Sequence, residues 1–301
     1  MRVSRQIRTD RTVQGLDAAL SDLISRAHAT DNQPPFNDQT RIALATGSAQ
    51  IITAENEAGT LLGVAVRDGA GFEAVIDPSA RGLGHGGALI AALLDTPGGA
   101  EITSAWAHGD HPGAAALARR HAFSRKRVLY RLARALDAGT PSDARDTPPS
   151  LAITTFDADR DADDWVALNA RVFATHPEQG AILRADLDAR IAEDWFDPRS
   201  FLLVRDAATH ALIAYNWLKI EPGSEDGEIY VIGVAEEAAG RGLGRHLMNA
   251  GLARFVELGL STASLYVDDS NAGAVALYRS LGFETDTVDV QYRRPQPGVR
   301  S

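Results

Sequence analysis

The chain has 301 residues, of which 45% are hydrophobic, and this is enough apolar material for two domains that each have their own core. The formal net charge is -10 and the longest basic run is Arg125-Lys126-Arg127, which argues against a general nucleic-acid binder. There is no cysteine, so disulfides and thiolate metal sites are excluded. The first thirty residues lack the continuous apolar run of a signal peptide or membrane helix, and we expect a soluble cytoplasmic protein.

In chain order, the first half opens with a helix over residues 15–28, whose leucines recur on one face. Apolar or alternating runs then predict strands, at 49–53, 61–67, 72–76, 102–106 and 123–132. Between the third and fourth of these strands, a glycine-rich loop leads into an apolar helix that ends near Leu94. A further helix is expected over 112–120.

Residues 137–150 are polar, proline-rich and without periodicity, which predicts a linker. We therefore expect a first domain over 1–136 and a second over 151–301. In the second half, β runs lie at 151–156, 201–205, 211–220, 228–234, 263–267 and 287–294. Helical segments are expected at 162–172, 185–194, 245–256 and from about 271 onward.

The most informative stretch of the chain is residues 227–248. An apolar, β-branched run over 229–234 passes through a polar connection into Gly240-Arg241-Gly242-Leu243-Gly244, and an amphipathic segment follows. Glycines let the backbone approach a ligand without interference from Cβ, and the first N–H groups of a helix attract anions. The spacing matches neither the dinucleotide fingerprint nor the nucleoside triphosphate loop. We expect it to bind a pyrophosphate.

The two halves of the chain repeat each other. Phe123 precedes Phe283 by 160 positions, and His111 precedes Asn271 by the same interval. The glycine loop of the first half, residues 82–87, matches that of the second half at an offset of 158 or 160. A repeat of this size indicates a duplicated domain rather than a solenoid.

The arginine-glycine pattern of the second loop resembles the acetyl-CoA loop of the GNAT superfamily of N-acetyltransferases, although Ala239 stands where Gln or Arg is usual. The run 265–267, then Asn271, then a tyrosine before Leu-Gly-Phe within 277–283 resemble the closing half of the same superfamily. The resemblance implies an α/β (α+β) fold class, with two tandem domains that each contain a mixed, mostly antiparallel central sheet flanked by helices. It also implies acetyl-CoA as co-substrate and no metal.

Acetyl transfer to an amine needs a base near the acceptor, because an ammonium has no lone pair, and an acid near the departing sulfur. Glu228 lies at the head of the strand that leads to the loop, and Tyr278 lies on the last helix. At the matched positions the first half has Ala70 and Ala118, so we expect the first domain to hold acetyl-CoA without catalysing in this way. The alternatives, a solvated carboxylate for Glu228 and a core residue for Tyr278, stay open.

The tandem arrangement narrows the resemblance to the mycothiol synthase family of actinobacteria. It is carried by the stretches 176–180, 216–220, 227–234, 265–268 and 288–292. That family acetylates the cysteinyl amine of a cysteine-glucosamine-inositol conjugate (desacetylmycothiol). The resemblance implies Glu228 as general base and Tyr278 as general acid. It also implies acceptor contacts from Asp38, Glu178, Lys219, Glu228 and Tyr266, although the family has a Glu at the position of Asp38.

The same resemblance implies which residues bind the acetyl-CoA. In the first domain these are Ala74, Val75, Ile76, Gly82, Leu83, Gly84, His85, Gly86 and Gly87. In the second domain they are Ile232, Gly233, Val234, Ala239, Gly240, Arg241, Gly242, Leu243, Gly244 and Arg245, followed by Asn271, Ala272, Gly273, Ala274, Val275 and Ala276.

Two other interpretations stay open. A tandem GNAT enzyme for another small amine, such as an aminoglycoside or a protein N-terminus, would keep both loops and the Glu228 and Tyr278 pair. A non-catalytic acetyl-CoA sensor would keep the loops, but the retention of acid and base in one half argues against it. The expected partners are a small thiol pseudodisaccharide and CoA, with no nucleic acid and no membrane, and a monomer is the default.

Overall fold

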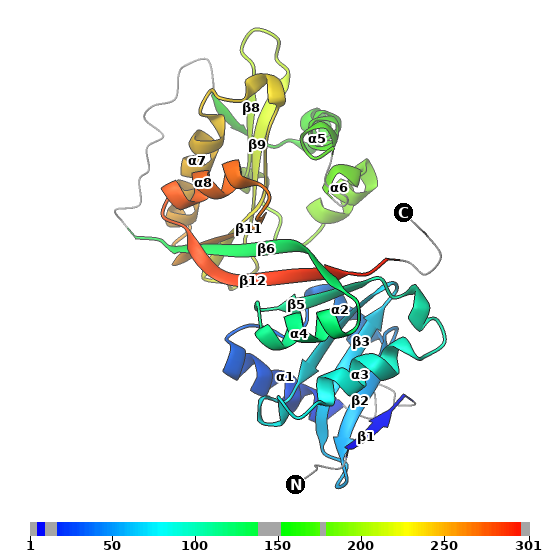
Figure 1. Cartoon of the computed structure of the whole chain (residues 1–301). Helices are drawn as coiled ribbons and strands as arrows, with labels where there is room; N and C mark the ends of the chain where they lie inside the picture. Colours follow the sequence, from blue (N-terminus) through cyan, green and yellow to red (C-terminus); the bar gives the residue numbers. More distant parts are fainter. Residues whose placement is uncertain (1–4, 10–16, 138–151, 175–178, 296–301) are drawn as a thin grey trace. The chain divides into compact units, whose positions relative to one another are not determined.

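The structure is a computed structural model, and it describes residues 5–9, 17–137, 152–174 and 179–295 (Figure 1). The chain divides into two compact units. The first consists of Met1–Tyr130, Asp268–Asn271 and Thr287–Ser301, and the second of Arg131–Val267 and Ala272–Asp286. The expected linker lies outside the described residues, apart from Asp137. Within the described residues, no helix is both long and apolar enough to cross a membrane.

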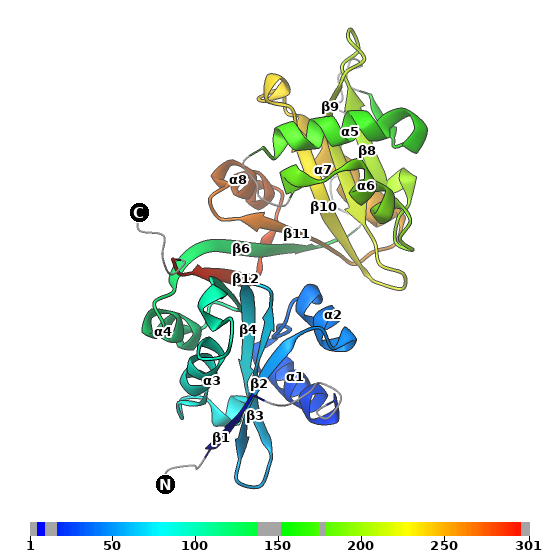
Figure 2. The ribbon, with the colours of Figure 1, turned by 90° about the vertical axis from the view of Figure 1, so that its right-hand side faces the viewer.

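The first unit is a sheet with helices on both faces. Its elements are β1 (Arg5–Arg8), α1 (Asp17–Asp31), α2 (Asp38–Thr46), β2 (Gln50–Asn56), β3 (Leu61–Asp68), β4 (Gly71–Ile76), α3 (His85–Leu94), β5 (Ser104–His108), α4 (Pro112–Arg120) and the first part of β6 (Ser124–Ala135). The strands β1-β2-β3-β4-β5 are followed by β12 (Glu284–Arg293), from the end of the chain. These neighbours pair antiparallel except β4 and β5, which run parallel. Figure 2 shows α1 and α2 on one face and α3 and α4 on the other.

The second unit repeats this plan. Its elements are the rest of β6, β7 (Ile153–Thr155), α5 (Ala158–Val172), α6 (Arg184–Ile191), β8 (Phe201–Arg205), β9 (Leu212–Lys219), β10 (Asp226–Val234), α7 (Leu243–Glu257), β11 (Thr262–Asp268) and α8 (Ala272–Ser280). The strand order is β6-β11-β10-β9-β8-β7. The pairs from β7 to β10 are antiparallel, and β10 and β11 are parallel. The expected mixed, mostly antiparallel α/β architecture is confirmed.

Each unit has its own core. In the first unit, Leu23 of α1 and Val64 of β3 belong to one buried cluster, and Leu89 of α3 belongs to another. In the second unit an aromatic group dominates, with the rings of Phe201 and Trp217 stacked at 4.4 Å between centroids. Such rings bury large apolar areas. They supply much of the core of the second unit, in line with the 45% of hydrophobic residues in the chain.

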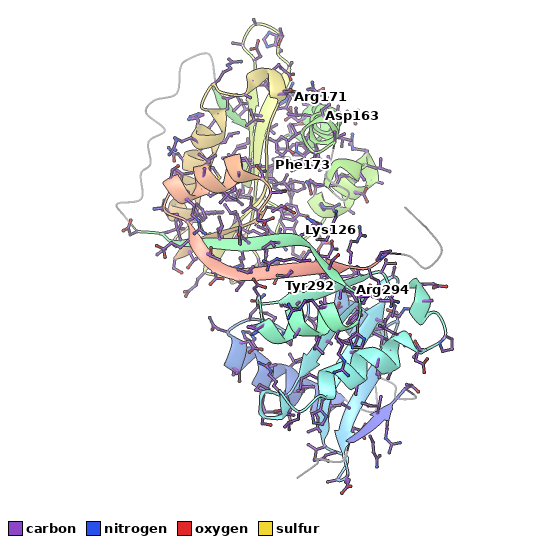
Figure 3. The ribbon with its side chains drawn as sticks, in the orientation of Figure 1. Lys126, Asp163, Arg171, Phe173, Tyr292 and Arg294 are labelled. Carbon is purple, nitrogen blue, oxygen red and sulfur yellow. The ribbon has the colours of Figure 1, made fainter. Side chains whose placement is uncertain are left out.

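The end of the chain belongs to the core of the first unit. Val290 on β12 is fully buried there and Tyr292 is 5% exposed, although the sequence places both after the helices of the second half. Figure 3 labels Arg294, which follows β12. Its guanidinium donates to the main-chain oxygens of Gly99 and Ile102. The first unit is therefore assembled from residues that are more than half the chain apart.

Local structure settles the register of the repeat. Gly82 and Gly84 have φ angles of 75° and 86°, and Gly240 and Gly242 have 74° and 78°, so the loops correspond at an offset of 158. After α4 the N–H of Phe123 donates to the oxygen of Ala118 at 2.8 Å, and after α8 the N–H of Phe283 donates to that of Tyr278 at 3.1 Å. The last helices therefore correspond at an offset of 160.

The mostly buried His108 joins β12 to the rest of the first unit. The Nδ1 of His108 on β5 lies 3.0 Å from the Asp289 carboxylate on β12, and its Nε2 lies 3.4 Å from the Glu73 carboxylate on β4. Gln33 also donates to Asp289. Burial alone would lower the pKa of His108, but hydrogen bonds to Asp289 and Glu73 and their charges raise it to about 9. The imidazole is therefore charged at neutral pH.

We expect this ion cluster to make stability depend on pH. The pKa of His108 is raised from 6.5 to about 9, so its contribution is complete below pH 6.5 and is lost as the pH rises through 9. The maximum loss is about 3 kcal/mol. The free energy of unfolding in urea, measured for the wild type and for His108→Gln at pH values from 6.5 to 9, gives this loss. If the stability of the wild type falls with pH no more steeply than that of His108→Gln, the charged His108 does not stabilise the fold as proposed.

Candidate active site

The site of the second unit lies where two parallel strands stop pairing. β10 pairs with β11 from Asp226 to Ile229 only, although both strands continue. On its other side, β10 carries a β-bulge between Ile229 and Val231, where Tyr230 is the extra residue in the pairing with β9. A bulge of this kind redirects side chains and increases the local twist. The carboxyl half of β10, residues 230–234, therefore runs on without pairing to β11, and an extended ligand chain could add there as a strand does.

The glycine loop faces the same end of β10. Gly242 is the N-cap of α7 and no side chain caps the helix, so its first N–H groups are left for a ligand, with the positive end of the helix dipole behind them. A Cβ placed on Gly240 or Gly242 would meet nothing within 4 Å. Arg245 in the first turn donates to the hydroxyl of Ser280 at 2.6 Å. This geometry suits a pyrophosphate.

Glu228 is half-buried on β10, directly opposite Lys219 on β9. The Nζ of Lys219 lies 2.6 Å from the Glu221 carboxylate and 5.4 Å from the ring centre of Trp195. Burial lowers the pKa of Lys219, but the hydrogen bond and charge of Glu221 and the charge of Glu228 outweigh it and raise the pKa. A fixed cation and a carboxylate thus stand side by side on adjacent strands.

Tyr278 is almost fully buried on α8, 6% exposed, and its ring lies 6.2 Å from that of Phe283. Burial raises its pKa to about 12, so the phenol keeps its proton at neutral pH and can act only as a donor of it. Asn271 immediately precedes the same helix, where its N–H donates to the oxygen of Asp268. Residues 272–276 form the first turns of α8.

The remaining expected acceptor contacts are spread over the chain. Tyr266 on β11 is 49% exposed. Asp38 is the first residue of α2, which belongs to the first unit, and its side chain is not described. Glu178 lies outside the described residues. The structure therefore brings together Glu228 and Lys219, with Tyr278 on a helix of the same unit, while the roles of all these residues stay predictions.

Three residues that the sequence did not indicate form a group of contacts beside Lys219. The ring of Trp195 lies 5.4 Å from that of Tyr230, beside the Lys219 cation. The Nε of Arg190 on α6 donates to the Tyr230 hydroxyl at 3.1 Å. Tyr230 lies two residues after Glu228 and therefore on the same face of the strand, a pattern from which its position beside the site can be predicted. Trp195 and Arg190 lie in or just after a helix and have no such signal, so only their contacts identify them.

The first unit contains a cavity of about 540 Å³ at the corresponding place. β4 and β5 pair only through Gly71 and Phe72, and the cavity opens beyond them. Its walls include most of the donor contacts expected in this half, Ala74, Val75, Ile76, Gly82, Gly84, His85, Gly86 and Gly87. Leu83 is not in the wall and is 54% exposed. His108 and Gln33 also line the cavity.

Known proteins share these features. Residues 165–283 match the model of the Acetyltransferase (GNAT) family. Among solved structures, a GCN5-related N-acetyltransferase from Sphaerobacter thermophilus has a TM-score of 0.76 at 18% identity, covering 99% of this chain and 98% of that one. A tandem GNAT protein from the clavulanic acid biosynthesis pathway has a TM-score of 0.68 at 16% identity, covering 99% and 100%. The fold is thus that of the tandem GNAT acetyltransferases, a class that uses acetyl-CoA as co-substrate.

Sequence relatives define the family. A mycothiol acetyltransferase from Clavibacter michiganensis subsp. michiganensis is 46% identical over 299 residues, covering 97% of this chain and 95% of that protein. Another from Thermobispora bispora is 42% identical, covering 94% and 98%. The chain belongs to the mycothiol acetyltransferase family.

We expect the Tyr278 phenol to stay protonated where ordinary tyrosines ionise. Its pKa is raised to about 12 by burial, whereas an exposed tyrosine titrates near pH ~10. The difference in phenolate absorbance between wild type and Tyr278→Phe should therefore stay close to zero up to about pH 10. A tyrosine amide in the same buffer provides the reference. A full phenolate difference at that pH, with circular dichroism unchanged, contradicts the burial argument.

Proposed function

We propose that this protein transfers the acetyl group of acetyl-CoA to the cysteinyl amine of the cysteine-glucosamine-inositol conjugate, the last step of mycothiol biosynthesis. The observation that carries the proposal is the half-buried Glu228 on the strand that ends at an uncapped glycine loop and helix. The full-length similarity to relatives named mycothiol acetyltransferase supports the acceptor.

Direct attack within a ternary complex fits the residues. The acceptor ammonium has a pKa near ~8, and Glu228 removes its proton directly or through a water. The free amine attacks the thioester carbonyl, the nitrogen loses its second proton to solvent, and the tetrahedral intermediate collapses with cleavage of the carbon–sulfur bond. Tyr278, which is protonated at neutral pH, gives its phenolic proton to the departing sulfur and then regains one from solvent. The products are the amide and CoA.

We assign the donor to two places. In the second unit, the residues 232–234 bind the pantetheine arm, 239–245 bind the pyrophosphate, and 271–276 close the site from α8. In the first unit, the 540 Å³ cavity binds a CoA thioester without transfer, because Ala70 and Ala118 replace the base and acid. We propose the limits 1–136 and 151–301, with a linker over 137–150, for the two duplicated copies in the sequence, and no metal. In the structure the last strand of the second copy, β12, completes the core of the first unit.

We assign the acceptor to the side of β10 that faces α6. Lys219, Glu178 and Tyr266 would offer donors and acceptors to the sugar and inositol hydroxyls. Trp195 lies beside the Lys219 cation and Tyr230 is held by Arg190, which supports a fixed wall at this position. We further propose a cytoplasmic monomer that binds neither nucleic acid nor membrane, in keeping with its net charge of -10.

The function is tested by incubating the purified protein with acetyl-CoA and the cysteinyl conjugate, and in parallel with an aminoglycoside panel. Mass analysis should find the conjugate N-acetylated selectively, with release of one CoA per product. Acetylation of another amine alone would retain the chemistry and overturn the acceptor. Binding of acetyl-CoA without any transfer would favour the sensor interpretation.

Replacing Glu228 should separate chemistry from donor binding. Glu228→Gln keeps the shape and removes the base, so kcat should fall by roughly 10² to 10⁴ while the affinity for acetyl-CoA is unchanged. Glu225→Gln, at an exposed position three residues earlier, is the matched control and should behave as wild type. Steady-state kinetics with the cysteinyl conjugate measures both. A Glu228→Gln enzyme with normal kcat would remove the proposed base.

Replacing a loop glycine by valine should abolish acetyl-CoA binding only in the unit that contains that loop. Gly82, Gly240 and Gly259 all have φ near +75° with nothing within 4 Å of a built Cβ, so valine strains the backbone equally at each. Calorimetry of acetyl-CoA binding should find Gly240→Val without the second-unit site and Gly82→Val without the first-unit site. Gly259→Val, after α7 and away from both loops, controls for strain. An equal loss of acetyl-CoA binding in all three variants would contradict the assignment of the two loops as binding sites.

A further inference from the structure

A second, smaller cavity adjoins the large cavity of the first unit. It has a volume of about 80 Å³. It shares five wall residues with the large cavity, Ala74, Trp106, Ala107, Ala114 and Leu117. Three of these five are alanines, so little side-chain volume separates the two spaces.

The small cavity occupies the place that a tyrosine fills in the second unit. Ala118 lines it, and the matching hydrogen bonds from Phe123 and Phe283 show that Ala118 corresponds to Tyr278. In the second unit the buried ring of Tyr278 packs 6.2 Å from Phe283. In the first unit a methyl group stands there instead, and the Phe123 ring borders the space that remains.

The walls of this space are largely hydrocarbon. Besides the alanines they comprise Phe72, Ile90, Trp106, Leu117 and Phe123, with His121 and Tyr292. Burial and the nearby Arg120 lower the pKa of His121, so its imidazole is neutral at physiological pH. No charged residue lines this cavity among the described residues. Its preferred guest is therefore an apolar group.

We propose that the first unit binds CoA thioesters with an unbranched acyl chain of three or four carbons in preference to acetyl-CoA. This rests on the proposed donor site of the first unit. In the proposed transfer reaction, the general acid Tyr278 lies near the departing sulfur of the thioester. Ala118 takes its position in the first unit, so the space that the smaller side chain leaves lies beside the thioester bound there. About 80 Å³ exceeds the volume of two water molecules at ~30 Å³ each, which is room for two further methylene groups.

The test uses the full-length Gly240→Val protein, in which only the first-unit loop is intact. Calorimetric titrations with acetyl-CoA and butyryl-CoA compare the two ligands at that site. Each buried methylene favours binding roughly fourfold, so butyryl-CoA should bind roughly 15-fold more tightly. Ala118→Phe in the same background fills the cavity and should remove this preference while acetyl-CoA still binds.

Ala118→Leu fills the space only partly, and it keeps the test valid if Ala118→Phe fails to fold. It should reduce the preference to an intermediate value. Equal or tighter binding of acetyl-CoA to Gly240→Val would overturn the inference, as would a butyryl preference that survives both substitutions. If neither thioester binds Gly240→Val, the inference falls with the first-unit site. Acetylation of the cysteinyl conjugate by the wild-type enzyme is measured separately and identifies a failure of the proposed function.

Discussion

Both proposed ligand sites depend on one constraint, the early end of pairing between two parallel strands. β10 pairs with β11 only through its residues 226–229, and β4 pairs with β5 only through Gly71 and Phe72. Past these points each sheet leaves one strand edge without its parallel neighbour. In both units the glycine loop and a helix without a side-chain cap follow that strand. Each proposed site therefore presents one continuous piece of backbone to an anion and an extended chain.

The duplicated scaffold carries two different polar interiors. In the second unit, Glu228 on β10 lies opposite Lys219 on β9, and the Tyr278 phenol is buried on α8. In the first unit, His108 lies between the carboxylates of Glu73 and Asp289. The two copies thus share the backbone geometry of the loops, whereas the first copy has Ala70 and Ala118 at the positions of Glu228 and Tyr278.

The sequence predicted the loops, the order of strands and helices, and the two-copy architecture, because glycine spacing and hydrophobic periodicity are local signals. It missed α2, which begins after the N-cap Asn37, and the short β1. Contacts between distant positions carry no such signal: Asp289 reaching His108, or Trp195 lying beside Lys219, became apparent only in the structure. The bulge at Tyr230 was hidden for the same reason, since it depends on pairing with β9.

The position of β12 has a consequence for synthesis on the ribosome. The first unit needs Val290 and Tyr292 in its core, and these residues are made after all helices of the second unit. Translation proceeds at roughly 5–20 residues per second, so the first half waits many seconds with one sheet edge unpaired. The first domain to be translated is then the last to be completed, and its nascent form exposes a strand edge that chaperones can recognise.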